Sequence, residues 1–294
     1  HEGFILTVSF LMMLGFGAKC GLYPLHGWLP TAHPPAPSPA SAVLSGIITK
    51  AGVLGIARLV FQFVGFSFLR GTWVQTAFMS VALFTVFMGS LLAFKENGFK
   101  KRLAYSSVSN LSYVLLGVAT LHPVGLCGAL LHVIAHALIK NTLFMSAGAI
   151  IHKTGKTKVD ELKGIGRQMP CTMWCFTLAG VGLVGIPPCL GFLSKWYLAQ
   201  GALEMTGTSA LFHWLAPAVL LISALLTAGY LLPVSIRGFF VGPDENGNRM
   251  EYETCEASWK MLVPLFLLTA LSVLLGIFPQ PLLQLFSSLA SGLM

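Results

Sequence analysis

His132, His136 and Lys140 stand at positions i, i+4 and i+8 of an apolar run from about 124 to 151. In a helix this spacing places the three side chains within an arc of about 80° on one face. The run is long enough to cross a bilayer, and a cation near its middle costs about 2.5 to 3.5 kcal/mol unless it is paired or faces water. Imidazole and ammonium groups at that depth can pass protons to one another. The presence of this cation on a face with two histidines therefore indicates a functional role.

Three further lysines, Lys19, Lys50 and Lys195, also lie inside apolar runs. Lys19 and Lys195 each stand beside a cluster of glycine and proline, residues that loosen a helix and remove backbone donors. The segments 3–29 and 171–203 are therefore expected to be discontinuous helices, and repeated broken helices are a sequence pointer to the ion site of a transporter. The candidate relay residues are Lys19, Lys50, Lys140 and Lys195, with His132 and His136 as relay groups or ligands of water.

No acidic residue of the chain lies as deep in an apolar segment as these four lysines do. All ten lie outside the apolar cores or at their ends. The lysines must therefore be neutral part of the time, contact water, or pair with an acid outside this sequence. The chain starts at His1 and enters an apolar run within three residues, so we expect it to be the C-terminal part of a longer protein.

The same residues also have ordinary structural interpretations. His132 and His136 can hydrogen-bond to neighbouring helices, and Lys50 can extend its ammonium toward the membrane surface. Metal or haem ligation is disfavoured, because both histidines lie on one helix and no further ligand is near in sequence. These interpretations leave unexplained why one chain has four deep lysines, two of them at helix breaks.

Two other polar groups stay open between structural and functional roles. His26 and His33 flank Trp28-Leu29-Pro30 at a predicted helix end, where a solvated interface and a functional site are equally consistent with the sequence. The segment 103–121 begins with a hydroxyl-rich stretch, which predicts either a water-accessible face or hydrogen bonds between helices. Its candidate residues are Ser106, Ser107 and Ser109.

The composition identifies an all-α polytopic membrane protein. Of 294 residues, 55% are apolar and 10% charged, and 31 glycines with 16 prolines fit a tightly packed bundle with broken helices. The net charge of +8 does not indicate nucleic acid, because four cations lie in apolar runs and most others cluster in three short loops. The six cysteines form no C-x-x-C pair, so neither a metal cluster nor a disulfide framework is expected, and no redox-centre motif is present.

Eight apolar segments set the expected topology. They run at about 3–29, 40–64, 72–94, 103–121, 124–151, 171–203, 211–236 and 261–278, and an amphipathic tail follows near 281–293. If 171–203 crosses the membrane once, twelve Lys and Arg residues fall on one side and two on the other; if it crosses twice, the division is nine to five. The positive-inside rule favours the single crossing. We therefore predict eight spans, two of them discontinuous, with both termini outside.

Several motifs in this order resemble one family of membrane subunits. They are Gly17-Ala18-Lys19, then 24–30 (PLHGWLP), 32–34 (AHP), 36–39 (APSP), 41–42 (SA), 45–46 (SG), 50–52 (KAG), 101–106 (KRLAYS), His136-Ala137-Leu138 with Lys140, and 185–188 (GIPP) with 191–192 (GF) and 194–195 (SK). The chain resembles the antiporter-like membrane subunits of respiratory complex I, of Mrp-type cation/proton antiporters and of membrane-bound energy-converting hydrogenases. The resemblance covers nearly the whole chain, and its first block is specific.

The resemblance implies about fourteen helices around two inverted five-helix repeats, of which this chain would begin at the seventh helix. Residues 1–64 would end the first repeat, 65–240 would form the second, and 241–294 would supply a loop, the last span and the tail. Lys19 and Lys195 would then be the lysines of the two broken helices, Lys50 that of the helix after the first break, and Lys140 that of the central axis. A glutamate on an earlier helix, outside this sequence, would pair with the first lysine.

The expected function is that of a proton-translocating membrane subunit in a complex I-like or hydrogenase-like assembly of the cell inner (cytoplasmic) membrane. It would bind no cofactor or metal itself, and its partners would be other membrane subunits, protons or Na+, and the lipid bilayer. One alternative is a subunit of a multisubunit Na+/H+ antiporter, and another is a structural subunit without transport. The proline-rich stretch 33–39 is closest to hydrogenase-type and related relatives.

Overall fold

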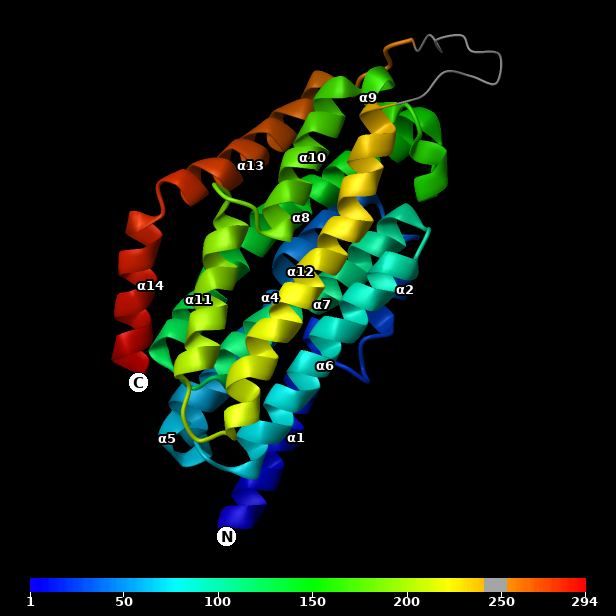
Figure 1. Ribbon diagram of the computed structural model, residues 1–294. Coiled ribbons are helices and arrows are strands. Elements are labelled where there is room, and N and C mark those ends of the chain that lie inside the picture. Colours follow the sequence, from blue (N-terminus) through cyan, green and yellow to red (C-terminus); the bar gives the residue numbers. More distant parts are fainter. Residues whose placement is uncertain (241–252) are drawn as a thin grey trace.

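The computed structural model describes residues 1–240 and 253–294. Within these ranges the chain is helical and forms no strand, which confirms the predicted all-α class. The elements are α1 (Glu2–Cys20), α2 (Trp28–Ala32), α3 (Ser38–Val43), η1 (Leu44–Ile48), α4 (Lys50–Arg58), η2 (Leu59–Val64), α5 (Phe66–Leu69), α6 (Trp73–Lys95), α7 (Phe99–Ala119), α8 (Pro123–Thr154), η3 (Val159–Leu162), α9 (Ile165–Gln168), α10 (Pro170–Val184), α11 (Leu190–Glu204), α12 (Ala210–Phe239), α13 (Trp259–Ile277) and α14 (Gln280–Leu293). Figure 1 shows them as an elongated bundle.

Six helices in the described part of the chain are long and apolar enough to cross a membrane. They are α1, the continuous run from α3 to η2, α6, α8, α12 and α13. The other two predicted spans miss that measure for different reasons. Helix α7 has 21 residues but carries a serine-rich first half, whereas α10 and α11 are two halves of 15 residues each. The protein is thus a multi-pass membrane protein.

The two halves α10 and α11 cross the bundle once. At one end, the Gly164 N–H just before α10 donates to the Arg237 carbonyl at the end of α12 (3.1 Å). At the other end, the Gln75 side chain near the start of α6 donates to the Thr206 carbonyl just after α11 (3.3 Å). Figure 1 shows α10 near one end of the bundle and α11 continuing toward the other. The predicted single crossing of 171–203 is confirmed.

The cations gather at one end of the bundle, which we call the basic end. Its described members are Lys95, Lys100, Lys101, Arg102, Lys153, Lys156, Lys158, Lys163, Arg167, Arg237 and Lys260, and the twelfth predicted cation, Arg249, lies outside the described residues. Arg58 and Arg70 lie toward the opposite end, where the Arg70 guanidinium donates to the Leu121 carbonyl (2.6 Å). Which end faces the cell interior stays a prediction of the positive-inside rule.

This arrangement predicts opposite accessibility for two loop positions. Gly98 lies at the basic end and Thr208 at the opposite end. Cysteines introduced by Gly98→Cys and Thr208→Cys in the full-length protein should therefore react with a membrane-impermeant maleimide from opposite sides of sealed vesicles. Labelling of both from one side would contradict the single crossing.

Both predicted helix breaks are present, and both begin at a glycine in the left-handed region. Gly21 follows α1 with φ 81°, and Gly185 follows α10 with φ 91°. The first break leads only to the short α2, whereas the second separates two equal halves. Helix α13 covers the second break, because a Cβ added at Gly276 would overlap the Pro188 carbonyl oxygen. Helix α13 covers the break on one side only, because Ile186, Pro187 and Pro188 remain exposed.

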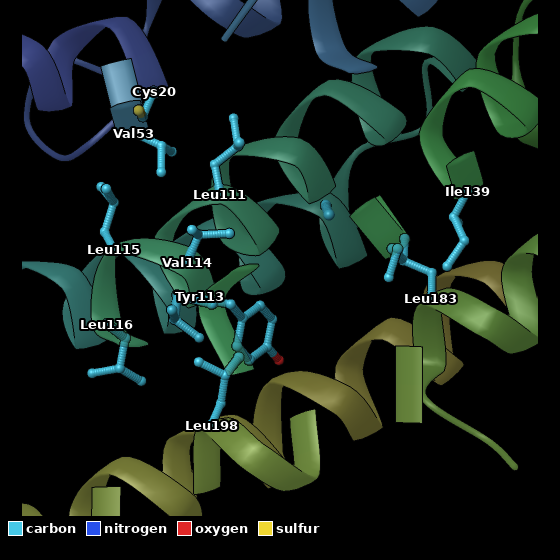
Figure 2. Close-up of a cluster of buried hydrophobic side chains, with 14 of the residues drawn as sticks. Cys20, Val53, Leu111, Tyr113, Val114, Leu115, Leu116, Ile139, Leu183 and Leu198 are labelled. Carbon is cyan, nitrogen blue, oxygen red and sulfur yellow. The ribbon is translucent and has the colours of Figure 1, made fainter. Parts of the chain in front are cut away.

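Helix α7 lies at the centre of the bundle. Figure 2 shows Leu111 and Leu115 of α7 on the side of Cys20 and Val53, which belong to α1 and α4, while Tyr113 points toward Leu198 of α11. Nearly all of α7 from Leu103 to Ala119 is buried. A helix surrounded by other helices does not need a lipid-facing apolar side, which explains why α7 can carry so many hydroxyls.

Helices α8 and α11 cross at glycines. A Cβ added at Gly201 would overlap the backbone of Gly125, and one at Gly128 would lie 2.6 Å from the Leu198 nitrogen. Small residues at such a crossing let the two backbones approach closely. The predicted amphipathic tail, α14, also packs against α8. Helix α8 is therefore the element around which the C-terminal part of the bundle is assembled.

Candidate functional site: a buried row of lysines and histidines

The Lys50 ammonium meets the α8 histidines at one end of the row. Its Nζ lies 2.8 Å from Nδ1 of His136 and donates to the Ser45 carbonyl (2.5 Å). Ser45 belongs to η1, a π-helical stretch directly before Lys50. Such stretches disturb the regular backbone pairing and are frequent at functional sites. The sequence placed Lys50 and His136 in separate segments, and the structure brings them into contact.

The two imidazoles continue the row along α8. The rings of His132 and His136 are 6.2 Å apart between centroids, and His132 Nδ1 lies 2.9 Å from the Ser194 hydroxyl of α11. The Tyr113 ring of α7 lies beside His132, at 5.3 Å. Both histidines are buried, and Nε2 of each has no partner among the described side chains and backbone. An imidazole with one bonded nitrogen and one open nitrogen can accept a proton on one side and release it on the other.

The Lys195 ammonium occupies the second helix break. It donates to the Leu183 carbonyl (2.6 Å) and to the Val184 carbonyl (2.9 Å), the last two residues of α10. It also lies 5.2 Å from the centre of the Tyr113 ring. The carbonyls at the end of a helix lack intrahelical donors and carry partial negative charge, so they stabilise a cation. Since Ser194 precedes Lys195, the row from Lys50 reaches this break.

Lys140 is fully buried beside the row, one turn beyond His136 on α8. Its ammonium donates to the Leu103 carbonyl of α7 (2.9 Å) and to the Ser106 hydroxyl. The ring of Phe144 lies 6.0 Å from the same Nζ. The predicted face of His132, His136 and Lys140 is thus present, and all three side chains point into the bundle.

Lys19 stands apart from this row. Its side chain is exposed on the described part of the chain, and its Nζ lies 5.7 Å over the Trp28 ring. The Trp28 indole donates to the Ala18 carbonyl (2.8 Å), so the ring is fixed beside the first break. The sequence grouped Lys19 with the buried lysines because of its depth in an apolar run. Within the described residues Lys19 is not enclosed with the other lysines, and its role in a relay stays a prediction.

The serines of α7 make hydrogen bonds within and between helices. Ser107 bonds to Ser45 of η1 at 2.7 Å, and Ser109 bonds to Ser90 of α6 at 2.7 Å and to Ser223 of α12 at 3.2 Å. Ser106 accepts from Lys140. The sequence left two interpretations open, and the structure supports hydrogen bonds between helices for all three serines, with Ser106 bonded to Lys140.

The two flanking histidines differ in environment. His26 is partly exposed, whereas His33 is fully buried and stacks on Phe144 with 4.5 Å between ring centroids. Neither ring nitrogen of His33 has a partner among the described residues. His33 is therefore not a solvated interfacial histidine: it lies behind the same phenylalanine that borders Lys140.

Carboxylates take no part in the row within the described residues. The ion pairs there join Lys101 to Glu96, His122 to Glu204 and Arg237 to Asp160, all in loops or at helix ends. No group of three His, Cys, Asp or Glu side chains in residues 1–240 and 253–294 is placed to hold a metal ion. All six cysteines are free thiols. The acceptors for the buried lysines are instead carbonyl, hydroxyl and imidazole groups.

The model of one protein family, described as NADH:quinone oxidoreductase/Mrp antiporter, TM, matches residues 2–227. The chain belongs to this family. Among curated members, NADH-quinone oxidoreductase subunit N of Desulforudis audaxviator (strain MP104C) is 36% identical over 288 residues, covering 95% of this chain and 56% of the relative. Hydrogenase-4 component B of Escherichia coli (strain K12) is 33% identical over 289 residues, which cover 94% of this chain and 43% of that relative. The resemblance drawn from the motifs is confirmed.

The fold agrees with the family assignment. A chain in the structure of the Mrp complex from Dietzia sp. DQ12-45-1b superposes with a TM-score of 0.87 at 24% identity, covering 98% of this chain and 59% of the other. The chain thus spans about half the length of the curated relatives it matches. The row of lysines and histidines therefore lies within a chain that corresponds to about half of a family member.

Sequence reasoning missed several partners in the row. Ser194 and Tyr113 reach His132 and Lys195 from α11 and α7, and spacing within one segment cannot reveal contacts between segments. The carbonyls that bind Lys195 carry no sequence signal except the Gly-Pro break that frees them. The break could have predicted this contact, because the freed carbonyls need a hydrogen-bond donor and Lys195 is close to them in sequence.

Proposed function

We propose that this protein is a proton-translocating membrane subunit of a respiratory or hydrogenase-type complex. The observation that carries the proposal is the row from Lys50 through His136, His132 and Ser194 to Lys195, which runs from α4 across α8 to α11. The row therefore joins three helices, and between His136 and His132 it follows one turn of α8. A charged lysine without a carboxylate partner at this depth has a high free-energy cost. A role in proton exchange explains why such lysines are present.

Each step of the row has a donor and an acceptor. An ammonium at Lys50 breaks an N–H bond while a new one forms at the unprotonated Nδ1 of His136, and the imidazole then releases the proton from Nε2. A water molecule would bridge the two imidazoles, since their centroids are 6.2 Å apart. The Ser194 hydroxyl can accept from one neighbour and donate to the next. Lys195 would hold the proton at the break, where the α10 carbonyls favour the charged form.

Lys140 supplies a second acceptor beside the row. Its bonds to Leu103 and Ser106 fix the ammonium one turn from His136, so a charge at Lys140 disfavours a second charge on the imidazole. This repulsion means that a positive charge on Lys140 favours release of a proton from His136 to the next group of the row. In the assembly, this push would originate in redox chemistry of partner subunits, and the chain itself would bind no cofactor.

The setting of the subunit is inferred from its relatives and its charges. Two relatives are named as an NADH-quinone oxidoreductase subunit and a hydrogenase component, so other membrane subunits would be the partners here. The cation-rich basic end would face the cytoplasm, as the positive-inside rule requires in a bacterial inner membrane. Both termini would then lie outside, and the two inverted repeats would meet between residues 64 and 65.

The proposal is tested by measuring proton transport in proteoliposomes that contain the purified complex with the full-length subunit. His136→Phe removes the contact to Lys50 and should lower proton transport at least about tenfold, since the ring nitrogens are lost while the volume is similar. The matched control is His213→Phe, because His213 lies at the opposite end and bonds only to the Leu203 carbonyl in the described structure (3.1 Å).

The ion dependence of the same vesicles distinguishes the alternatives. Proton uptake that persists in sodium-free buffer supports the proposal, whereas an absolute requirement for Na+ would favour the antiporter alternative. Sodium prefers carboxylate and carbonyl oxygen ligands, and no carboxylate of the described residues takes part in the row. Transport by His136→Phe at the wild-type rate would instead favour a structural subunit.

A further inference from the structure

A cavity of about 660 Å³ lies at the basic end, apart from the row. Its walls come from the segment 35–39, the last turns of α8 and the start of α13. This volume is in the range of pockets that hold a ligand. A neighbouring cavity of about 320 Å³ shares Lys100 and Ile151 with it, so the two form one crevice.

The charged side chains that line the larger cavity are all basic. They are Lys100, Lys260 and, when protonated, His152, and no acidic side chain of the described residues lines it. The Lys100 ammonium donates to the Ala36 carbonyl (2.9 Å), which fixes it at the wall and leaves two N–H groups for a ligand. Lys260 and His152 are exposed. This set of donors suits an anion.

The remaining wall is apolar and extends toward the membrane interior. Met145 lies seven residues before His152 on α8, about 10 Å deeper along the helix, and Met261 faces the same cavity. Trp259, beside Lys260, is 72% exposed, and tryptophan at the end of a spanning helix marks the level of the lipid headgroups. A ligand here would need an anionic head at the level of Lys260 and an apolar tail along Met145.

The cavity is formed by rigid backbone. Pro35, Pro37 and Pro39 restrict the segment that lines it, and Gly148 of α8 packs so closely on Ser38 that an added Cβ would overlap the serine side chain. The segment is therefore held against α8 without a ligand. A preformed site binds with a smaller loss of conformational freedom.

We propose that this cavity binds one anionic phospholipid. Its phosphate contacts Lys100, His152 and Lys260, and an acyl chain lies along Met145 and Met261. The positive-inside rule places the basic end at the cytoplasmic leaflet, and basic pockets between spanning helices on that side hold anionic headgroups. Binding of this lipid does not depend on proton transport.

The test measures lipid retained by the purified complex that contains the full-length subunit. Native mass spectrometry is run after incubation with phosphatidylglycerol or with phosphatidylcholine of the same chains. We expect tight binding of phosphatidylglycerol alone, and a loss of about fivefold in affinity for Lys100→Gln and a larger loss for Lys260→Glu, which reverses a charge. The control Lys163→Ala removes an exposed cation of the same end that does not line the cavity and should change nothing.

Three outcomes would overturn the proposal. Equal retention of the two lipids would show a merely apolar groove, and unchanged binding by Lys260→Glu would exclude the phosphate contact. Absence of any bound phosphatidylglycerol would mean that a protein segment fills the cavity in the assembly. If Lys100→Gln fails to assemble, Lys260→Glu still decides, because that side chain is exposed and makes no described hydrogen bond.

Discussion

Lys140→Ala should abolish most proton transport by the assembly, lowering the rate about a hundredfold. The ammonium is fully buried, bonded to Leu103 and Ser106, and one turn from His136. Alanine leaves no group at this position that can take up or release a proton. The measurement is the initial rate of dye-detected proton uptake in proteoliposomes, normalised to the amount of assembled complex.

Two further variants separate charge from proton exchange at this position. Lys140→Arg keeps the charge, yet a guanidinium does not release its proton at physiological pH, so transport should fail as in the alanine variant. Lys140→Met keeps most of the volume and should preserve assembly while still blocking transport. Lys95→Ala removes an exposed cation at the end of α6 and should leave the rate nearly unchanged. Wild-type transport by Lys140→Ala would exclude the relay.

The sequence predicted the elements that depend on patterns within one segment. The eight apolar segments match the helices to within a few residues at most ends, and glycine with proline predicted both breaks. The charge asymmetry predicted the single crossing of 171–203, because it is a property of the whole chain rather than of one contact. The face formed by His132, His136 and Lys140 followed from helical periodicity alone.

Contacts between segments could not be predicted in this way. Lys50 meets His136 because η1, which precedes Lys50, packs against α8, and helix pairing carries no signal in the spacing of either segment. Lys19 also shows that contacts between segments cannot be predicted from one segment, but here the contact with the row is missing. Its depth in an apolar run was evident from the sequence, but its exposure depends on which helices cover that face. The division into inverted repeats stays a prediction.

Gly201→Ala should destabilise the bundle by about 3 kcal/mol, at the upper end of the usual cost of overpacking. The added methyl would overlap the backbone of Gly125, and a backbone cannot move aside as a flexible side chain can. The α8–α11 crossing must then open. The fall in the thermal midpoint of the full-length protein in detergent measures this cost.

The same substitution should also impair transport in the protein that still folds. Ser194 of α11 and His132 of α8 bond across this pair of helices, so separating α11 from α8 lengthens the 2.9 Å contact in the row. Gly292→Ala is the matched control, since a Cβ there meets nothing within 4 Å in the described structure. An unchanged midpoint for Gly201→Ala would mean that α8 and α11 do not cross at these glycines, and the position of Lys195 beside the row would lose its support.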